Sequence, residues 1–435
     1  MASKMRVLVF PAGSEIAAEV FDALRMQKDV ELFGATSVRD HAEMLFRHLA
    51  TGIPYLGDDG LIESLNEVIA NWSIDFLWPA RDDVQLFLTL HEADVACRVV
   101  TSPLETVEIL RSKRLTYEAL AGEDFIPHTF DNPTERDLPI FAKPSVGEGS
   151  KGAELVTELS RAREIAVSEQ DFVLCEYLPG TAYTVDCFTG NNGKLLCCIP
   201  RTRDRVKAGI SVRSEVIQDV MIRERVREIG ERINARFEFR GVWFFQLKER
   251  SDGALILMEA SPRVPGTMAL TRVLGVNYPL LTLYLMRDVD IAVKWLDVPA
   301  LLDKAFVSRF RLGLEYNTVY MDYDDTMTMG DTVNPLVMAF IYQCRNRGKR
   351  IVLLTRHDDE VLGELHEDMA RRGIAETLFD RIVHLGLTES KSDFVTEQSS
   401  VFVDDSFSER VEIYRDCAIP VFGIDGIEAL IDWRQ

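Results

Sequence analysis

The chain lacks several features that would assign it to a specialised class. None of its 435 residues fall in a run near the ~18 apolar residues that span a bilayer, and its N-terminus has no signal-peptide pattern. Its seven cysteines include no CxxC pair, and its seven histidines show no zinc-ligand spacing. No internal repeat or low-complexity linker is visible. We therefore expect a cytoplasmic protein with free thiols.

Positive charge is also scarce. Lys and Arg number 49 against 70 Asp and Glu, which leaves a formal net charge of −21. A field of this sign repels nucleic acid and anionic lipid surfaces, so we predict neither as a partner. It does not exclude a bound nucleotide, because a local cluster of Lys and Arg can hold phosphates. No pattern in the sequence indicates an oligomeric state.

Apolar runs alternate with helical patterns and divide the chain into three stretches. In residues 1–103, strand-like runs such as 6–10 and 30–34 predict an open α/β sheet. In residues 104–312, one helix predicted over 104–121 precedes strand pairs flanked by helices, which indicates an α+β unit. Residues 313–435 return to alternation, with strands predicted at 318–322, 350–355, 400–404 and 419–422. The predicted fold class is a multidomain α/β protein.

Polar residues end three apolar runs in the last stretch. They are Asp322 and Asp324 after the first run, Thr355 at the second, and Asp404 and Asp405 at the third, with Lys391 between the last two. Since ligands bind at the carboxyl ends of parallel strands, we expect these groups to converge. Carboxylates suit Mg²⁺ and can act as nucleophile and acid/base, while a hydroxyl and an ammonium stabilise phosphoryl oxygens. One such strand end would usually only begin a turn, but three in this order predict phosphoryl chemistry.

The last stretch resembles the haloacid dehalogenase (HAD) superfamily through all four motifs of that family. The resemblance implies that Asp322 is the nucleophile, that Asp324 is the acid/base and a backbone-carbonyl metal ligand, and that Asp404 and Asp405 complete a magnesium site. It also implies that Thr355 and Lys391 hold the phosphoryl group of a phosphomonoester. The intervals between motifs leave no room for the cap domain of many relatives. We expect a capless HAD-like Rossmannoid domain over 313–435.

A glycine-rich segment marks the middle stretch. Residues 141–152 read as a strand followed by a loop in which Lys143 and Lys151 flank Gly147 and Gly149. Glycines let backbone N–H groups approach phosphate oxygens without a Cβ clash. Taken alone, such a segment is more often an ordinary hairpin turn.

A second group of polar residues follows about 110 residues later. Gln246 lies on one apolar strand, Glu259 ends the next, and Arg263 comes four residues later. An amide oxygen and a carboxylate at one sheet edge favour Mg²⁺ bound to nucleotide phosphates, and an arginine beside them would neutralise the γ-phosphate.

Residues 5–311 resemble the ATP-grasp superfamily in its carbamoyl-phosphate-synthase-like branch. The resemblance implies a Rossmann-like pre-ATP-grasp domain over 1–103 and an ATP-grasp domain over 104–312. It assigns Lys113, Lys143, Gly147, Gly149, Ser150 and Lys151 to the phosphates, Glu176, Tyr177 and Leu178 to adenine, Gln246 and Glu259 to metal, and Arg263 to the γ-phosphate or acyl phosphate. Two positions depart from the family pattern. Ser261 replaces the Asn of Glu-x-Asn, and Ala182 replaces a ribose-binding Glu.

Residues 200–209 form a basic cluster in this acidic chain. Two interpretations stay open: a solvated loop, or a site where arginine binds a carboxylate substrate.

These motifs together predict an ATP- and Mg²⁺-dependent carboxylate–amine (or carboxylate–thiol) ligase. Such an enzyme forms an acyl phosphate from small-molecule carboxylate and amine substrates, and here it is fused to a phosphatase. Two alternatives remain: a phosphatase with a degenerate, regulatory nucleotide-binding domain, or a nucleotide-sensing scaffold. The sequence identifies no individual substrate.

Overall fold

The chain folds into two compact units, Met1–Phe306 and Val307–Arg434, and each is described by itself. The computed structural model describes residues 4–434 except Glu148, Ser150, Ala208, Phe306, Ser308, Arg311, Gly363 and Leu387. None of the helices in this described part is long and apolar enough to cross a membrane. All seven cysteines are free thiols, and four of them are buried.

The first unit begins with a five-stranded parallel sheet of order β3-β2-β1-β4-β5. Its strands are β1 (Met5–Phe10), β2 (Val30–Thr36), β3 (His48–Thr51), β4 (Phe76–Pro79) and β5 (Arg98–Val99), and its helices are α1 (Glu15–Leu24), α2 (Leu61–Trp72) and α3 (Asp82–Leu90). Strand β1 is central because its apolar side chains pack into cores on both faces of the sheet. This is the strand order of doubly wound sheets, and it brings the turns after β1 and β4 to one edge.

The helix predicted over 104–121 was wrong, because two helices occupy this stretch. They are α4 (Leu104–Arg111) and α5 (Lys113–Ala119). Ser112 between them is extended, and its Oγ accepts a hydrogen bond of 3.2 Å from the backbone N–H of Leu115. A serine that caps a new helix ends the previous one, although the apolar periodicity runs through it. The break turns Arg111 and Lys113 toward the same cavity.

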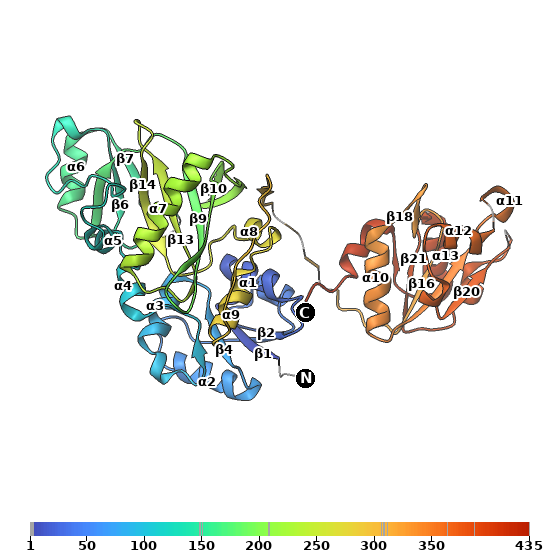
Figure 1. Cartoon of the computed structure of the whole chain (residues 1–435). Helices are drawn as coiled ribbons and strands as arrows, with labels where there is room; N and C mark the ends of the chain where they lie inside the picture. The colour runs from blue at the N-terminus through green and yellow to red at the C-terminus, as the bar shows by residue number, and fades with distance from the viewer. Residues whose placement is uncertain are drawn as a thin grey trace. The chain divides into compact units, whose positions relative to one another are not determined.

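A small antiparallel sheet of order β7-β6-β8 follows. It consists of β6 (Ile140–Pro144), β7 (Glu154–Val156) and β8 (Phe172–Glu176), and α6 (Leu159–Ala166) packs on it. Its core is a separate cluster of six buried residues around Ile140 and Leu174. In Figure 1 this subdomain lies at the far end of the first unit from β1, β2 and α2.

A four-stranded antiparallel sheet of order β10-β9-β13-β14 completes the first unit. Its strands are β9 (Ala182–Thr189), β10 (Leu195–Thr202), β13 (Gly241–Glu249) and β14 (Leu255–Ser261); beside them lie α7 (Val220–Arg236), α8 (Ala269–Val273) and α9 (Tyr278–Leu285). A second small sheet joins β11 (Arg205–Lys207), β12 (Ile210–Glu215) and β15 (Leu301–Asp303). One hydrophobic core contains Val7 and Phe21 of the parallel part together with Phe188 and Tyr278, so it crosses the predicted boundary at residue 103.

The second unit is built on a parallel sheet of order β20-β19-β16-β21-β22. Its strands are β16 (Thr318–Met321), β19 (Arg350–Thr355), β20 (Arg381–His384), β21 (Ser400–Val403) and β22 (Val421–Phe422); its helices are α10 (Pro335–Asn346), α11 (Asp359–Leu362), α12 (Leu365–Arg371) and α13 (Phe407–Cys417). Strand β16 is buried and central, with β19 and β21 as its neighbours. After β16 comes a short hairpin of β17 (Thr328–Met329) and β18 (Thr332–Val333). The described residues of the second unit form two hydrophobic clusters, one around Met321 and one around Tyr320.

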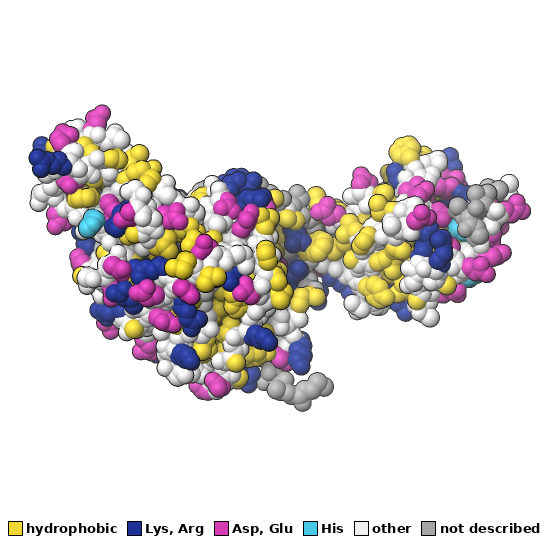
Figure 2. All heavy atoms as spheres, turned by 45° about the horizontal axis from the view of Figure 1, so that its top comes forward, with side chains coloured by type: hydrophobic (Ala, Val, Ile, Leu, Met, Phe, Trp, Pro, Cys, Tyr) yellow, Lys and Arg dark blue, Asp and Glu magenta, His cyan; other side chains and the backbone are white. Residues whose placement is uncertain are grey.

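Charges of both signs are intermingled on the face that Figure 2 shows, where Lys and Arg lie among Asp and Glu.

Candidate active sites

Three adjoining cavities lie in the first unit. The largest, of about 410 Å³, shares Lys113, Gln246 and Glu259 with a second of about 270 Å³. The second shares Lys143 with a hollow of about 30 Å³. Every described residue that the sequence assigned to nucleotide or metal in this unit lines one of them: Lys113, Lys143, Gly147, Gly149, Lys151, Glu176, Tyr177, Leu178, Gln246, Glu259 and Arg263. Ser150 lies outside the described residues.

The predicted adenine linker borders the smallest hollow. The Glu176 carboxylate accepts a hydrogen bond of 3.0 Å from the backbone N–H of His128, so this side chain is held away from a ligand. Tyr177 is 37% exposed and Leu178 is buried. The hollow measures about 30 Å³ and adjoins the second cavity at Lys143.

Gln246 and Glu259 are directly opposite each other in the β13–β14 register. Opposed residues of an antiparallel pair lie on the same face of the sheet, so the amide and the carboxylate are neighbours. The Lys113 ammonium lies 3.8 Å from the Glu259 carboxylate and donates a hydrogen bond of 3.2 Å to the Gly147 carbonyl. This lysine therefore connects the glycine-rich loop to the predicted metal ligands.

Lys143 is buried with neutral hydrogen-bond partners. Its ammonium donates to the Tyr117 hydroxyl at 2.6 Å and to the Met258 carbonyl at 3.2 Å. Burial lowers the pKa of Lys143, and burial also lowers the pKa of Lys113 against the nearby Glu259 charge. Two partly desolvated ammonium groups at one cavity wall favour binding of phosphate.

Arg263 contacts a residue that the sequence analysis missed. Its Nε donates a hydrogen bond of 2.7 Å to Asp82, and the Ser261 hydroxyl donates to the same oxygen at 3.0 Å. Burial alone would raise the pKa of Asp82, but the charge and hydrogen bond of Arg263 hold it at about 2. Ser261 is thus directed to Asp82 in this structure. The sequence contained a signal for Asp82, because this carboxylate follows the apolar strand β4 and so lies at the carboxyl edge of the parallel sheet.

Gly149 of the glycine-rich loop packs against Gly209. A Cβ on Gly209 would lie 2.3 Å from the Gly149 Cα, and the φ of Gly209 is +79°. Both facts require glycine at this position, because the two backbones touch. The loop is thereby held over the cavities that Gly149 and Lys151 line.

The basic cluster of residues 200–209 divides by environment. Arg201 is only 1% exposed and pairs with the buried Asp186 at 3.0 Å, so the solvated-loop interpretation is wrong for it. Arg205 pairs with Asp303 at the surface. Arg203 lines the large cavity and donates to the Thr184 hydroxyl at 3.3 Å and the Gly209 carbonyl at 3.0 Å. The carboxylate-binding interpretation therefore concerns Arg203.

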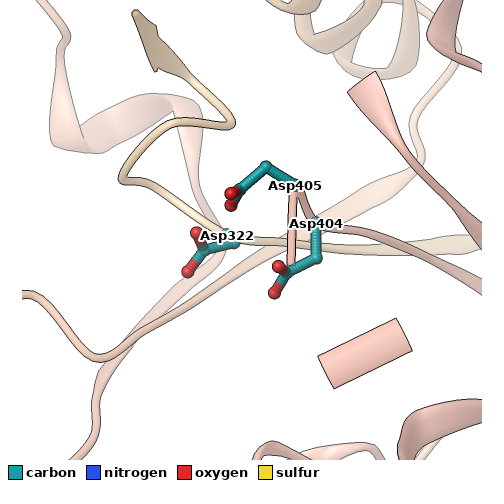
Figure 3. A group of neighbouring side chains, drawn as sticks. All are labelled: Asp322, Asp404 and Asp405. Carbon is teal, nitrogen blue, oxygen red and sulfur yellow. The ribbon is translucent and has the colours of Figure 1, made fainter. Parts of the chain in front are cut away.

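A second group of functional residues lies in the second unit, where Asp322, Asp404 and Asp405 converge (Figure 3). Within the described ranges this is the one group of three or more potential metal ligands, and its ligand atoms lie within 4.8 Å of one another. The Lys391 ammonium donates to Asp322 at 2.6 Å and to Asp404 at 2.7 Å. Burial raises the pKa of Asp322 to about 7, Lys391 opposes that shift, and the Asp404 charge adds to it. Oxygen ligands of this kind fit Mg²⁺.

Asp324 and Thr355 lie at the same edge and share a neighbour, His357, that the sequence analysis missed. The His357 Nδ1 lies 2.9 Å from the Asp324 carboxylate, and the His357 backbone N–H donates to the Thr355 hydroxyl at 3.2 Å. Thr326, also missed, accepts a hydrogen bond of 2.9 Å from the Asp405 backbone. Lys391 thus lies with Asp322, Asp404 and Asp405, while Asp324 and Thr355, joined through His357, lie at the ends of the neighbouring strands β16 and β19.

Comparisons with known proteins concern mainly the ATP-grasp resemblance. Residues 168–308 match the family model described as ATP-grasp in the biosynthetic pathway with Ter operon. No curated protein sequence matches the chain.

Several solved structures are similar at low sequence identity. A Campylobacter jejuni biotin carboxylase in a β,γ-ATP complex is 12% identical, with a TM-score of 0.57 over 68% of this chain and 74% of that chain. An Aspergillus clavatus N5-carboxyaminoimidazole synthase with ADP and 5-aminoimidazole ribonucleotide is 13% identical, with a TM-score of 0.56 over 69% and 82%. The biotin carboxylase domain of a Hydrogenobacter thermophilus 2-oxoglutarate carboxylase, solved with MgADP and bicarbonate, is 15% identical, with a TM-score of 0.54 over 68% and 72%. The chain thus contains a mixed α/β module with an ATP-grasp-like fold, and residues 168–308 match an ATP-grasp family model.

Proposed function

We propose that the first unit is an ATP-dependent carboxylate–amine (or carboxylate–thiol) ligase and that the second is a Mg²⁺-dependent phosphatase. In this proposal residues 1–103 are a pre-ATP-grasp domain, 104–312 the ATP-grasp domain and 313–435 a capless HAD-like domain. The observation that supports the ligase best is the opposed Gln246–Glu259 pair, which Lys113 links to the glycine-rich loop beside a cavity of about 410 Å³.

The cavities suggest how MgATP binds. The base would occupy the hollow at Glu176–Leu178, and the phosphates would follow Lys143 and Lys113 toward the glycine-rich loop. Glu259 and Gln246 supply hard oxygen donors and would hold Mg²⁺, which neutralises phosphate charge. The largest cavity then remains for the other substrates. Its volume falls within the usual range for small-molecule sites.

The ligase reaction proceeds in two balanced steps. A carboxylate oxygen of the substrate attacks the γ-phosphorus, the bond to the bridging oxygen breaks, and ADP leaves. The amine nitrogen or thiol sulfur then attacks the acyl carbon, inorganic phosphate leaves, and the nucleophile loses its proton. Arg263, oriented by Asp82, and Arg203 are placed to stabilise the charge on the transferred group and on the carboxylate.

The phosphatase reaction uses the strand-end residues of the second unit. The Asp322 carboxylate attacks the phosphorus of a phosphomonoester while Asp324 donates a proton to the leaving oxygen. Asp324 then takes a proton from water, which attacks the phosphorus and restores Asp322. Thr355 and Lys391 bind the phosphoryl oxygens, and Asp322, Asp404 and Asp405 would hold Mg²⁺.

ADP release from the full-length protein tests the ligase. The assay supplies MgATP with a panel of amino acids and small carboxylates. Glu259→Ala should abolish ADP formation because the metal loses its carboxylate, whereas Glu231→Ala on the exposed face of α7 should retain it. Unchanged ADP formation in Glu259→Ala would mean that the metal ligands are assigned wrongly.

One observation favours a second candidate function. The Ser261 hydroxyl donates its hydrogen bond to Asp82. Of the motif positions Glu259–Ser261, only the Glu259 side chain is therefore left to bind the predicted metal. A weakened metal site suits a regulatory domain that binds nucleotide without turnover. Calorimetric binding of MgATP with no ADP release from any substrate would support this candidate over the ligase.

A further inference from the structure

The large cavity of the first unit has more positive charge than MgATP binding requires. Lys113 and Lys151 line both the large cavity and the second cavity of about 270 Å³, where the phosphates are proposed to bind. Arg263 is paired with Asp82. Two further arginines line this cavity: Arg203, which is assigned above to the carboxylate, and Arg111, which has no role in the scheme so far. These two arginines indicate which class of substrate the site binds, a step that rests on the proposed ligase function.

Within the described ranges neither arginine forms an ion pair within 4.0 Å, although the Glu259 charge acts on Arg203 and the Arg111 charge acts on Asp82. Within the part of the chain that the structure describes, no carboxylate lies within 4.0 Å of Arg203, whose partners are the neutral Thr184 hydroxyl and Gly209 carbonyl. Burial lowers the pKa of Arg203. Buried charges are normally paired, because desolvation without a partner is costly. Arg203 is half-buried and faces the cavity without an ion pair, with only the more distant Glu259 charge acting on it, which favours an anionic ligand there.

Arg111 is equally unpaired among the described residues, which give it neither an ion pair nor a hydrogen bond. It is half-buried at the end of α4, immediately before the Ser112 break that turns Lys113 into the cavity. Its charge helps to lower the pKa values of Asp82 and Lys113, so it lies near both. By contrast, Arg81 of the same cavity already pairs with Asp83.

The two arginines line different sets of cavities. Arg203 borders both the large cavity and the second cavity of about 270 Å³, where the phosphates are proposed to bind, so it lies where the γ-phosphate would meet a carboxylate. Arg111 borders the large cavity alone. One carboxylate at the reaction centre would satisfy Arg203 and leave Arg111 without a partner.

We propose that the carboxylate substrate carries a second anionic group, and that Arg111 binds this group while Arg203 binds the carboxylate that becomes activated. The second group is a carboxylate or a phosphate, both of which match the planar fork of a guanidinium. A substrate with a neutral group at that end would leave Arg111 desolvated and unpaired. The site thereby selects dianionic substrates over their neutral analogues.

Matched substrate pairs test this proposal with the full-length protein. ADP release is measured with glutamate against glutamine, succinate against succinamate, and phosphoserine against serine. At least one dianion should exceed its neutral analogue by about tenfold or more in kcat/KM, and the pairs distinguish carboxylate from phosphate as the second group. Arg111→Gln should remove that preference without changing the KM for ATP. Arg227→Gln, on the surface of α7 and paired there with Glu231, is the matched control.

The outcomes separate this proposal from the ligase assignment. Equal turnover of dianions and neutral analogues, or a preference that survives Arg111→Gln, would overturn the proposal while the ligase stands. If no carboxylate substrate leads to ADP release, the ligase assignment fails. The preference for a second anionic group is then tested by calorimetric binding instead of turnover. Succinate or inorganic phosphate should then bind the MgADP-loaded protein and lose about tenfold or more in affinity in Arg111→Gln. Absence of such binding would overturn the proposal as well.

Discussion

Replacing Asp82 with Asn tests the contact between the parallel sheet and the ATP-site arginine. The substitution keeps the shape of the side chain but removes the charge that Arg263 and Ser261 contact. The pKa of Asp82 is about 2 in the folded protein against an ordinary value of 3.8. This lowering of the pKa corresponds to roughly 2 kcal/mol of stability near neutral pH, a figure that already includes the contact with Arg263.

The loss should appear as a shift in the melting temperature of the first unit. At roughly 2.1 cal/mol/K per residue, the unfolding entropy of a unit this long is about 0.64 kcal/mol/K, so a loss of about 2 kcal/mol lowers Tm by about 3 °C. Calorimetry of the wild type and of Asp82→Asn measures this difference. Asp83→Asn is the matched control, because its pair with Arg81 is partly exposed and contributes below about 1 kcal/mol.

The pH dependence provides a second measurement with a definite sign. A carboxyl group with a lowered pKa stabilises the folded state above its unfolded pKa, and this contribution is lost as the pH falls toward the folded value. The stability advantage of the wild type over Asp82→Asn should be constant above about pH 5 and shrink between about pH 4 and pH 2. A Tm difference below about 1 °C, or one that does not change with acidification, would refute the role assigned to the Asp82–Arg263 pair.

Three further predictions concern single residues. Asp322→Asn should eliminate phosphomonoester hydrolysis while ADP release continues, and loss of both activities would contradict separate sites. Gly209→Ala should reduce ADP release by about tenfold or more, because its Cβ would overlap Gly149 at 2.3 Å; circular dichroism should show a retained fold, and unimpaired turnover would contradict the contact. Lys143→Met should raise the KM for ATP by about tenfold or more through loss of the ammonium held by Tyr117, whereas phosphatase kinetics should not change; an unaltered KM would exclude a phosphate contact.

Much of the fold was predictable because buried strands leave a strong local pattern. The predicted strand 350–355 agrees with β19 to the residue, and the predicted strands 318–322 and 400–404 are each one residue longer than β16 and β21. Asp322, Asp404 and Asp405, which follow two of these strands, lie together. These elements are apolar, short and followed by turn residues, so local sequence suffices to place them.

Contacts between distant segments were not predictable. The Asp82–Ser261 hydrogen bond joins residues 179 positions apart, and no local pattern pairs them. The break at Ser112 was missed because apolar periodicity continues across a capping residue. The basic cluster misled for a related reason. Arg201 is buried because it pairs with Asp186 on the neighbouring strand β9, two residues from its register partner Thr184, and sequence spacing alone does not reveal this pair.

Among the described residues, the hydrophobic clusters of the first unit are formed by residues 5–302 and those of the second by residues 316–433. A core lesion such as truncation of Leu353 therefore removes apolar contacts from a cluster of the second unit. If each unit has the activity proposed for it, core missense variants should fall into two groups, each losing one proposed activity and retaining the other. Because one polypeptide contains both units, translation also produces them in equal number, and a cell can alter that ratio only by cutting or inactivating one unit after synthesis.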